Sequence, residues 1–506
     1  MKKIFFLFAL IGCLTCVKAQ NINGYIVSDT GNLTIIKVWG SHYERGFAYG
    51  YLCPAKILSM MNDYILPVFG SNLPLARQIL QQGNTLVVDS VYYDEARGLL
   101  AGIDSAGYDI SAYTYLDVIV ANCLLDFASI AGLKSKFTSP GCSSLMSWGT
   151  ATAGTDLDAK SVISRHLDWE NDYAIINNQV VVIHIPSESN EQPWAMIGFA
   201  GQISALSGVN RHMGVFQHMM SDFSGSGQLN RYYEPIWFSL RKAIETVDYN
   251  NDGKNNTSDL CSILSAHANG YADGYIISML ASADNDSSSL IAQVAELAPA
   301  SPYITFRGSE FPDSINADNL YCANYEIKRN DHYHFCDRYI RTMHAVDNGT
   351  GISRQRNLEI LRDSSNSGIY NIQFMQFIPD EDRLNISVHK HGKPAFMNPP
   401  VSLNLNDLFT DVSFISSGYN EEQHVMIYPN PVKECLYLQL PMSFEENVSI
   451  IIHDMTGRKI SVFSVPAGVN NHQDCKVDVK HIPAGLYVCR IIYDKHSTAK
   501  IFAKTK

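Results

Sequence analysis

Residues 140–144 (PGCSS) and 164–169 (SRHLDW) decide the fold of this chain. A strand-like run follows Cys142, and after an intervening turn the second stretch has the composition of another strand. Two strands joined as a β-hairpin lie side by side. The returning strand is therefore expected to bring Arg165 and Asp168 next to Cys142 in an antiparallel sheet.

A cysteine that directly follows a glycine has a specific chemical use. If the Gly141–Cys142 bond is cleaved, Cys142 gains a free α-amine, whose unperturbed pKa is about 7.7 to 8.0. That amine can act as the general base for the thiol of the same residue. Arg165 would then favour the thiolate and hold the substrate, and Asp168 would orient the amine. An amide side chain is also needed to stabilise the oxyanion.

Each of these residues also has a structural interpretation. Most cysteines are small buried hydrophobic residues, so Cys142 could be buried or form a disulfide. Arg165 and Asp168 could form a simple ion pair across the hairpin. Of the 11 cysteines, Cys13 and Cys16 belong to a predicted signal peptide, which leaves an odd number. If the others pair, one thiol stays free, and Cys142 is the leading candidate.

The two stretches resemble the peptidase C45 group of N-terminal nucleophile hydrolases, which includes acyl-coenzyme A:6-aminopenicillanic acid acyltransferase. The group is related to choloylglycine hydrolases and acid-ceramidase-like amidases. Its R-N-L-D-W/Y element is matched at 165–169, with His166 in place of the Asn. The resemblance runs from about residue 33 to about residue 400 and includes 40–46 (GSHYERG) with Gly50, similar to the propeptide opening, 207–210 (SGVN) with Gly214, and 322–325 (CANY).

This resemblance implies a fold, a cleavage and a set of catalytic residues. The fold would be a four-layer αββα sandwich, and the chain would cut itself between Gly141 and Cys142. Cys142, Arg165 and Asp168 would be catalytic, and no cofactor would be needed for catalysis. The two cleaved chains are expected to stay associated.

Two asparagines are candidates for the oxyanion. Asn324 lies where the family has its catalytic Asn, and Asn210 lies in the segment 207–210. Asn324 is favoured, because Arg211 and His212 follow Asn210 where the family commonly has an acidic residue and a small spacer. Because Asn is common in turns, Asn324 could equally be a turn residue.

The implied activity is that of a cysteine amidohydrolase or acyltransferase. It would remove the acyl group of a small N-acyl amide through a thioester on Cys142 and pass it to water or to another acceptor. Two alternatives stay open. One is a phospholipase B-like lipid esterase, a related N-terminal nucleophile family, and the other is a non-catalytic surface binding protein with the same fold.

The rest of the chain before residue 410 alternates between strand-like and helical blocks, which is typical of an α+β domain. We expect a propeptide-like N-terminal chain at 20–141 and a catalytic region at 142–410. The spacing of apolar residues predicts strands at 32–39, 143–150, 161–164, 179–185 and 194–199, and helices at 43–59, 89–130, 233–268 and 337–362.

Residues 1–19 are typical of a signal peptide. Lys2 and Lys3 precede an apolar stretch at 4–14, and small residues before Gln20 supply the cleavage site. The apolar stretch is too short to span a bilayer. The LIGC sequence that ends at Cys13 is similar to a lipoprotein box, so lipidation stays open.

The C-terminal region has a different character. After a polar linker at 411–425, residues 426–506 contain short alternating strands at 435–440, 448–453, 459–465, 476–479 and 485–493, which predict a small all-β sandwich. The motifs at 428–431 (YPNP), 454–458 (DMTGR) and 484–487 (AGLY) resemble the C-terminal sorting domain of the type IX secretion system.

That resemblance implies the type IX secretion machinery as a partner. The protein would cross the periplasm and the outer membrane and be secreted or held at the outer-membrane surface. The alternative is an adhesive or carbohydrate-binding sandwich.

An Asp- and Asn-rich segment at 248–259 (DYNNDGKNNTSD) places oxygen atoms at the spacing of a calcium loop, with Gly253 at the sharp turn. It resembles the dockerin-type calcium loop. A solvent-exposed loop without an ion is the alternative. The candidate ligands for structural Ca²⁺ are Asp248, Asn250, Asp252, Lys254, Asn256 and Asp259.

The charge balance argues against nucleic acid as a partner. Lys and Arg total 38 against 50 Asp and Glu, which gives a net charge of −12. The sequence therefore offers no basic stripe of the kind that phosphate binding needs. Apolar residues at 46% and charged residues at 17% are typical of a globular protein.

Overall fold

The computed structural model describes residues 22–410 except 133–140, 220–225, 286, 313–314, 330–335, 366–367 and 391. Further along it describes residues 426–428, 430–439, 448–454, 458–465, 475–493 and 496–505. The predicted signal peptide and linker, and Pro140, lie outside these residues. The chain divides into two compact units, 1–410 and 411–506, and each is described by itself.

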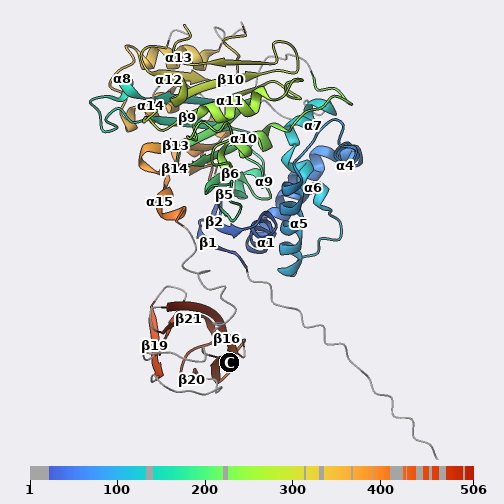
Figure 1. Cartoon of the computed structure of the whole chain (residues 1–506), viewed down its shortest axis with the longest axis vertical. Helices are drawn as coiled ribbons and strands as arrows, with labels where there is room; N and C mark the ends of the chain where they lie inside the picture. Colours follow the sequence, from blue (N-terminus) through green and yellow to red (C-terminus); the bar gives the residue numbers. More distant parts are fainter. Residues whose placement is uncertain are drawn as a thin grey trace, which may run out of the picture. The chain divides into compact units, whose positions relative to one another are not determined.

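The first unit contains two sheets with helices around them (Figure 1). The larger sheet has nine strands in the order β1-β2-β5-β6-β7-β8-β9-β10-β11. All neighbours are antiparallel except β2 and β5. The strands are β1 (Gly24–Asp29), β2 (Leu33–Gly40), β5 (Gln179–Pro186), β6 (Trp194–Phe199), β7 (Ser207–Asn210), β8 (Met213–Met219), β9 (Tyr275–Ala281), β10 (Ala292–Leu297) and β11 (Ile304–Arg307).

The smaller sheet has six antiparallel strands in the order β12-β3-β4-β13-β14-β15. It contacts the larger sheet through β3 and β8. Its strands are β3 (Gly141–Ser147), β4 (Val162–Asp168), β12 (Asn319–Cys322), β13 (Asn371–Ile378), β14 (Arg383–Val388) and β15 (Val401–Asn404).

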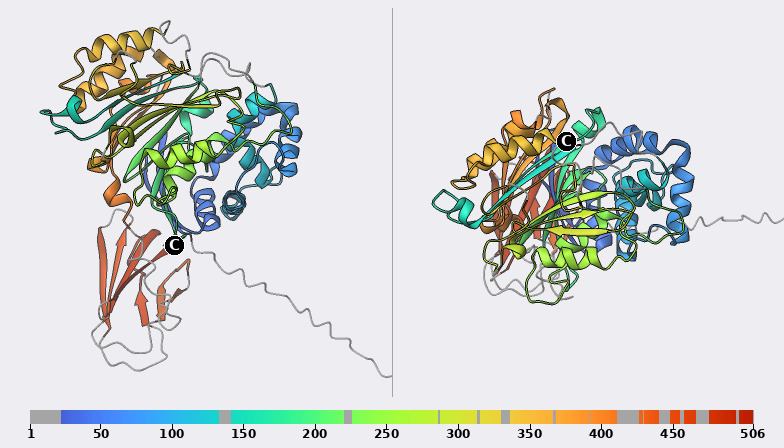
Figure 2. Two further views of the ribbon diagram at one scale, coloured as in Figure 1. Left: turned by 45° about the horizontal axis from the view of Figure 1, so that its top comes forward. Right: turned by 90° about the horizontal axis from the view of Figure 1, so that it is seen from above.

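Helices pack against both sheets (Figure 2). On the larger sheet lie α10 (Ile236–Glu245) and α11 (Thr257–Ser265), and on the smaller sheet lie α13 (Asp337–Val346) and α14 (Arg354–Ser365). Short helices α8 (Gly149–Thr152), α9 (Tyr173–Asn177), α12 (Ser288–Ile291) and α15 (Leu405–Leu408) lie in the connections. The predicted α+β class is confirmed. Among the described residues, no helix has the length and apolar character needed to cross a bilayer.

The N-terminal segment forms a helical layer beside the larger sheet. Its helices are α1 (His42–Leu52), α2 (Pro54–Ser59), α3 (Leu66–Phe69), α4 (Leu73–Gln82), α5 (Ser90–Ser105), α6 (Tyr115–Asn122) and α7 (Leu124–Ile130), with a π-helical turn at Met60–Ile65. The helix predicted at 43–59 is divided after Leu52, because Pro54 lacks the N–H that a continuous helix needs.

Glycines let α1 and α5 approach more closely than side chains would allow. A Cβ on Gly46 would lie 2.1 Å from the carbonyl oxygen of Glu95, and one on Gly98 would lie 2.1 Å from that of Tyr43. Real Cβ atoms do not approach so closely, so the two backbones are in direct contact. This contact fixes Glu95 over the first turn of α1.

Two predicted elements differ from the structure in a way that matters for the site. The strand predicted at 143–150 ends at Ser147, because Gly149 has a φ of 50° and begins the short helix α8. The helix predicted at 233–268 is divided into α10 and α11 by a loop that holds most of the proposed calcium ligands.

The second unit contains a three-stranded sheet, β16-β17-β20, and a four-stranded sheet, β19-β18-β21-β22. Side chains from both sheets, among them Leu436, Ile450 and Ile491, form one buried core. The strands are β16 (Met426–Tyr428), β17 (Cys435–Gln439), β18 (Val448–Asp454), β19 (Lys459–Val465), β20 (Cys475–Asp478), β21 (Gly485–Tyr493) and β22 (His496–Lys504), of which β16 and β22 were not predicted.

Candidate active site

The thiol of Cys142 lies at the start of β3, beside the end of β4. The register pairs Gly141 with Asp168, so the two strand ends meet at one edge of the sheet. The Nη2 atom of Arg165 lies 3.7 Å from the Sγ atom of Cys142 and donates to the backbone carbonyl of Gln217 at 2.8 Å. The β3–β4 hairpin thus places Arg165 against the thiol, with β8 fixing its guanidinium.

Burial controls the protonation state of this thiol. Cys142 is 2% exposed and Arg165 is fully buried. Burial raises the pKa of the Cys142 thiol, and the nearby Arg165 guanidinium opposes this shift only in part. In the uncleaved chain the thiol is therefore protonated at neutral pH, and its attack on a substrate needs a base that takes up the proton.

Asn324 holds the backbone nitrogen of the same cysteine. Its Oδ1 accepts from the Cys142 N–H at 3.1 Å, and its Nδ2 donates to the carbonyl of Met219 at 2.6 Å. Asn324 follows β12, which pairs with β3 through Cys322 and Ser144. The sheet register therefore places one amide side chain between the cysteine and the end of β8.

Asp168 is fixed by two partners that the sequence did not suggest. Its Oδ2 pairs with Nη2 of Arg338 from α13 at 2.9 Å, and its Oδ1 accepts from Nδ2 of Asn371 at 3.1 Å. Burial disfavours the charge of Arg338, but the Asp168 carboxylate outweighs it and raises the pKa of the guanidinium. Asp168 and Arg338 thus form a charged pair beside Gly141.

The absence of a side chain at Gly141 makes room for that guanidinium. A Cβ on Gly141 would lie 3.0 Å from Nη1 of Arg338. The positive charge therefore lies directly against the residue before Cys142. Neither Arg338 nor Asn371 was predicted to have a role in the site, because both reach it through the fold.

His166, which replaces the family's Asn, does not face the thiol. Its ring is fully buried against Phe374 and Phe396, with ring centroids 4.4 and 5.9 Å away. Burial lowers the pKa of His166, so its ring is neutral. His166 is therefore a core residue of the smaller sheet.

Asn210 is not brought to this site. Its Nδ2 donates to the carbonyl of Ile244, and its Oδ1 accepts from the N–H of Met213, both at 2.8 Å. Met213 and Met219 are the two ends of β8, about 20 Å apart at the usual rise of a strand, and Cys142 lies near the Met219 end. Asn210 builds the β7–β8 turn, so we exclude it from the site.

An apolar cavity of about 40 Å³ lies at the same edge of the larger sheet. Phe199 ends β6 at this edge, and Nε1 of Trp237 donates to the side chain of Gln217, whose carbonyl holds Arg165. The lining includes Met60, Met61 and Tyr64 from the N-terminal segment and Trp169, Phe199 and Trp237 from the region after Cys142.

The proposed calcium loop forms successive turns that are stabilised by its own side chains. The carboxylate of Asp248 accepts from the N–H groups of Asp252 and Gly253, at 3.2 and 2.8 Å. The Oδ1 of Asn250 accepts from the N–H of Asp252 at 3.0 Å. The Oδ2 of Asp252 accepts from Nδ2 of Asn250 at 2.9 Å. Side chains of three candidate ligands thus gather around one turn, which suits a small oxygen-binding cation.

Two other candidate ligands have structural roles in the same loop. Asn256 is the N-cap of α11, where its side chain accepts from the N–H of Ser258. Asp259 accepts from the N–H groups of Tyr249 and Asn256, at 2.7 and 2.8 Å. Asp259 still joins both ends of the loop, but Asn256 is used to cap a helix. The donor set therefore fits calcium only in part.

In the described part of the chain, each cysteine is a free thiol. Cys53, Cys123 and Cys322 are buried, and burial raises the pKa of each of these thiols. Cys142 differs from these three cysteines because the Arg165 guanidinium contacts its sulfur and Asn324 accepts a hydrogen bond from its backbone nitrogen.

Comparison with known proteins identifies the second unit. The family described as "Secretion system C-terminal sorting domain" matches residues 426–504. The C-terminal unit is a sorting domain. The protein is therefore exported by the type IX system to the cell surface or the extracellular space.

For the first unit the relatives are distant. Protein dcd1B of Dictyostelium discoideum is 21% identical over 258 residues, which is 45% of this chain and 46% of the relative. An uncharacterized protein of Archaeoglobus fulgidus is 32% identical over 123 residues, which is 22% of this chain and 19% of the relative. The chain thus spans about half the length of the first and about a fifth of the second.

Two solved structures are also similar in part. One is a mutant conjugated bile acid hydrolase from Clostridium perfringens, at 11% identity and a TM-score of 0.32, covering 52% of this chain and 93% of that one. The other is PorZ of Porphyromonas gingivalis, at 18% identity and a TM-score of 0.13, covering 25% and 15%. We draw nothing further from likenesses at these TM-scores.

Proposed function

We propose that the first unit is a self-processing N-terminal nucleophile hydrolase with the four-layer αββα arrangement, acting on a small N-acyl amide through a Cys142 thioester. The observation that carries this proposal is the convergence on Cys142. Arg165 contacts its sulfur, Asn324 accepts from its nitrogen, and the Asp168–Arg338 pair lies beside Gly141.

The first step would be cleavage of the chain. The Cys142 thiol adds to the carbonyl carbon of Gly141, and its proton passes to the Cys142 nitrogen as the C–N bond breaks. The products are a thioester between Gly141 and Sγ and a free α-amine. Water then hydrolyses the thioester, which releases the Gly141 carboxylate and restores the thiol.

The α-amine then supplies the base that the buried thiol lacks. It accepts the thiol proton as the sulfur adds to the substrate carbonyl, and it returns that proton to the leaving amine. The acyl group is left as a thioester on Cys142. Water gives hydrolysis, and another amine in its place gives acyl transfer.

Asn324 has the chemistry to serve both the amine and the oxyanion. A primary amide has one acceptor oxygen and two N–H donors. The oxygen accepts from the Cys142 nitrogen and one N–H binds Met219. We assign the second N–H to the oxyanion, and we assign Arg165 to the thiolate. The apolar cavity beside Trp169 suits the acyl group.

Intact-mass measurement and N-terminal sequencing of the secreted protein test the proposal. We expect two associated chains, one beginning near Gln20 after removal of residues 1–19 and one beginning at Cys142. Cys142→Ala should remain uncut at this bond. An uncut wild-type chain would favour a non-catalytic binding protein. The products formed when phospholipid and N-acyl amides are both offered as substrates distinguish a lipid esterase from an amidase.

A further inference from the structure

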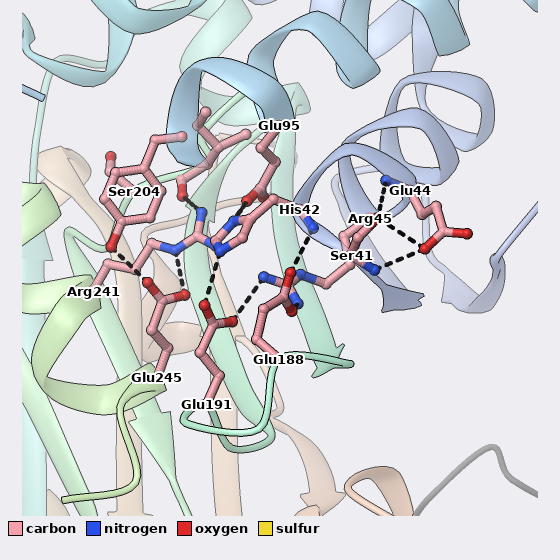
Figure 3. Close-up of polar contacts among 12 residues, drawn as sticks. Ser41, His42, Glu44, Arg45, Glu95, Glu188, Glu191, Ser204, Arg241 and Glu245 are labelled. Carbon is pink, nitrogen blue, oxygen red and sulfur yellow. Dashed lines mark hydrogen bonds and ion pairs between the residues drawn. The ribbon is translucent and has the colours of Figure 1, made fainter. Parts of the chain in front are cut away.

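A second group of charges, most of them buried, lies apart from Cys142, where α1, α5, α10 and the β5–β6 loop meet (Figure 3). Two of its residues, His42 and Arg45, come from the GSHYERG segment, to which the catalytic mechanism gives no role. We call it the buried ion cluster. Its members are His42, Arg45, Tyr92, Glu95, Glu188, Glu191, Arg241 and Glu245.

Arg241 is the centre of one half of the buried ion cluster. Its Nη2 pairs with Glu95 and its Nε with Glu245, both at 2.7 Å, and the Arg241 and Glu95 side chains are fully buried. The hydroxyl of Tyr92 donates to Glu245. Because the side chains of Arg241 and Glu245 are buried, removal of Arg241 would leave the Glu245 carboxylate without the cation that pairs with it.

His42 and Arg45 form the other half. The two ring nitrogens of His42 lie 2.8 Å from Glu95 and 2.8 Å from Glu191. Arg45 pairs with Glu188 at 2.8 Å and with Glu191 at 3.0 Å. Every charged side chain of the buried ion cluster therefore has an oppositely charged partner.

Ligand atoms of His42, Glu188 and Glu191 lie within 4.8 Å of one another, a spacing that could hold a metal ion. The surroundings argue for a protonated histidine instead. The guanidinium of Arg45 already pairs with both glutamates. Burial opposes charge on the ring, but the bonds to Glu191 and Glu95 raise the pKa of His42 to about 9.

The buried ion cluster joins two parts of the chain that self-cleavage would separate. His42, Arg45, Tyr92 and Glu95 precede Cys142, and the other four members follow it. The glycine contact between α1 and α5 holds the first four residues as one group. The same N-terminal segment supplies Met60, Met61 and Tyr64 to the apolar cavity.

We propose that the buried ion cluster fastens the N-terminal segment to the catalytic body, so that cleavage before Cys142 yields a two-chain protein that keeps both chains. The partner that this surface fits is the protein's own N-terminal chain. The two-chain consequence rests on the proposed self-cleavage, whereas the contact itself does not. If the N-terminal segment separated, the apolar cavity would lose Met60, Met61 and Tyr64 from its lining.

This contact should weaken at alkaline pH. The pKa of His42 is raised on folding from 6.5 to about 9, so its contribution is complete below pH 6.5 and is lost as pH rises through about 9. The titratable and charged groups that face His42 are Glu95 and Tyr92 of α5, Arg45 of α1, His184 of β5, Glu188 and Glu191 of the β5–β6 loop, and Arg241 and Glu245 of α10.

The experiment cuts the full chain on demand. A site for a specific protease is inserted between Lys134 and Ser135 in Cys142→Ala protein, which does not cut itself. After cutting, we expect the two chains to co-elute on a sizing column at pH 7. Between pH 7 and pH 10, the urea concentration that separates them should fall. Separation at pH 7 without urea would overturn the proposal.

Variants assign the effect to the buried ion cluster. Arg241→Met should lower the separating urea concentration by roughly 1 M or more. The matched control Arg362→Met removes an exposed pair with Asp363 and should leave it unchanged. The two chains of His42→Gln protein should separate at the same urea concentration at pH 7 and at pH 10. Equal behaviour of Arg241→Met and Arg362→Met, or an unchanged pH response in His42→Gln, contradicts the proposal. Because the His42→Gln readout does not depend on Arg241, it decides the matter if Arg241→Met fails to fold.

Discussion

At the scale of single residues, Arg165 and Asp168 have different roles although they lie on one strand. Arg165 contacts the sulfur of Cys142, whereas Asp168 is held by Arg338. We therefore expect Arg165→Met to lower turnover by roughly 100-fold even in protein that is fully cleaved, because the thiolate loses its guanidinium. Turnover numbers of the purified two-chain fraction provide the measurement. Unchanged turnover would assign Arg165 to folding alone.

Arg338 makes a separate prediction about stability. It is the cation paired with the buried carboxylate of Asp168. Arg338→Met should cost about 2 to 3 kcal/mol of unfolding free energy, because the buried Asp168 carboxylate would lose the cation that pairs with it. Urea unfolding measures this loss. The exposed-pair control Arg362→Met should cost less than about 0.5 kcal/mol, and an equal loss in both variants would contradict the role given to Arg338.

At the scale of elements, the loop between α10 and α11 is the proposed calcium site. Excess Ca²⁺ should raise stability by mass action, by about 2.7 kcal/mol at one hundred times the dissociation constant. Asp252→Ala should abolish this increment and leave cleavage at Cys142 intact. Asp94→Ala, which removes an exposed carboxylate on α5, should retain it. Thermal unfolding with and without Ca²⁺ measures the increment in each variant. An equal increment in Asp252→Ala and Asp94→Ala would show that the ion binds elsewhere.

Two strands of the larger sheet show which parts of the fold can be predicted from the sequence. The strands at 179–185 and 194–199 were placed to within a residue, because continuous apolar runs between turn residues define buried strands. The sequence favoured Asn324 over Asn210 from the neighbouring residues alone, but it could not show which of them lies beside Cys142. Whether either asparagine reaches Cys142 depends on which end of β8 lies beside β3. That is set by how the two sheets pack, which no local sequence pattern reports.

Arg338 and Asn371 were missed as site residues for a related reason. Arg338 reaches Asp168 from α13, and Asn371 does so through the β4–β13 register. Each lies about 170 or more residues from Asp168 in sequence, and no local pattern reports a contact of that range. The buried ion cluster is likewise assembled by the fold, although the GSHYERG segment had already been singled out.

At the scale of the whole molecule, the sorting domain is expected to serve export alone. It has its own sheets and its own buried core. Deletion of residues 426–506 should therefore leave the first unit folded and able to cleave itself, but retained in the periplasm. Immunoblots of periplasmic and culture fractions report this outcome. Normal secretion of the truncated protein would contradict the sorting role.

The proposed enzyme activity of the first unit depends on one covalent bond. In the proposed mechanism the acyl group passes through the sulfur of Cys142, which Arg165 contacts, with the new α-amine as the base. The most direct measurement is the mass of the protein trapped by acid quench during turnover of an N-acyl amide. We expect one acyl group per molecule, located by peptide mapping at Cys142, and none in Cys142→Ala. An acyl group on another residue, or none when deacylation limits the rate, would contradict the account.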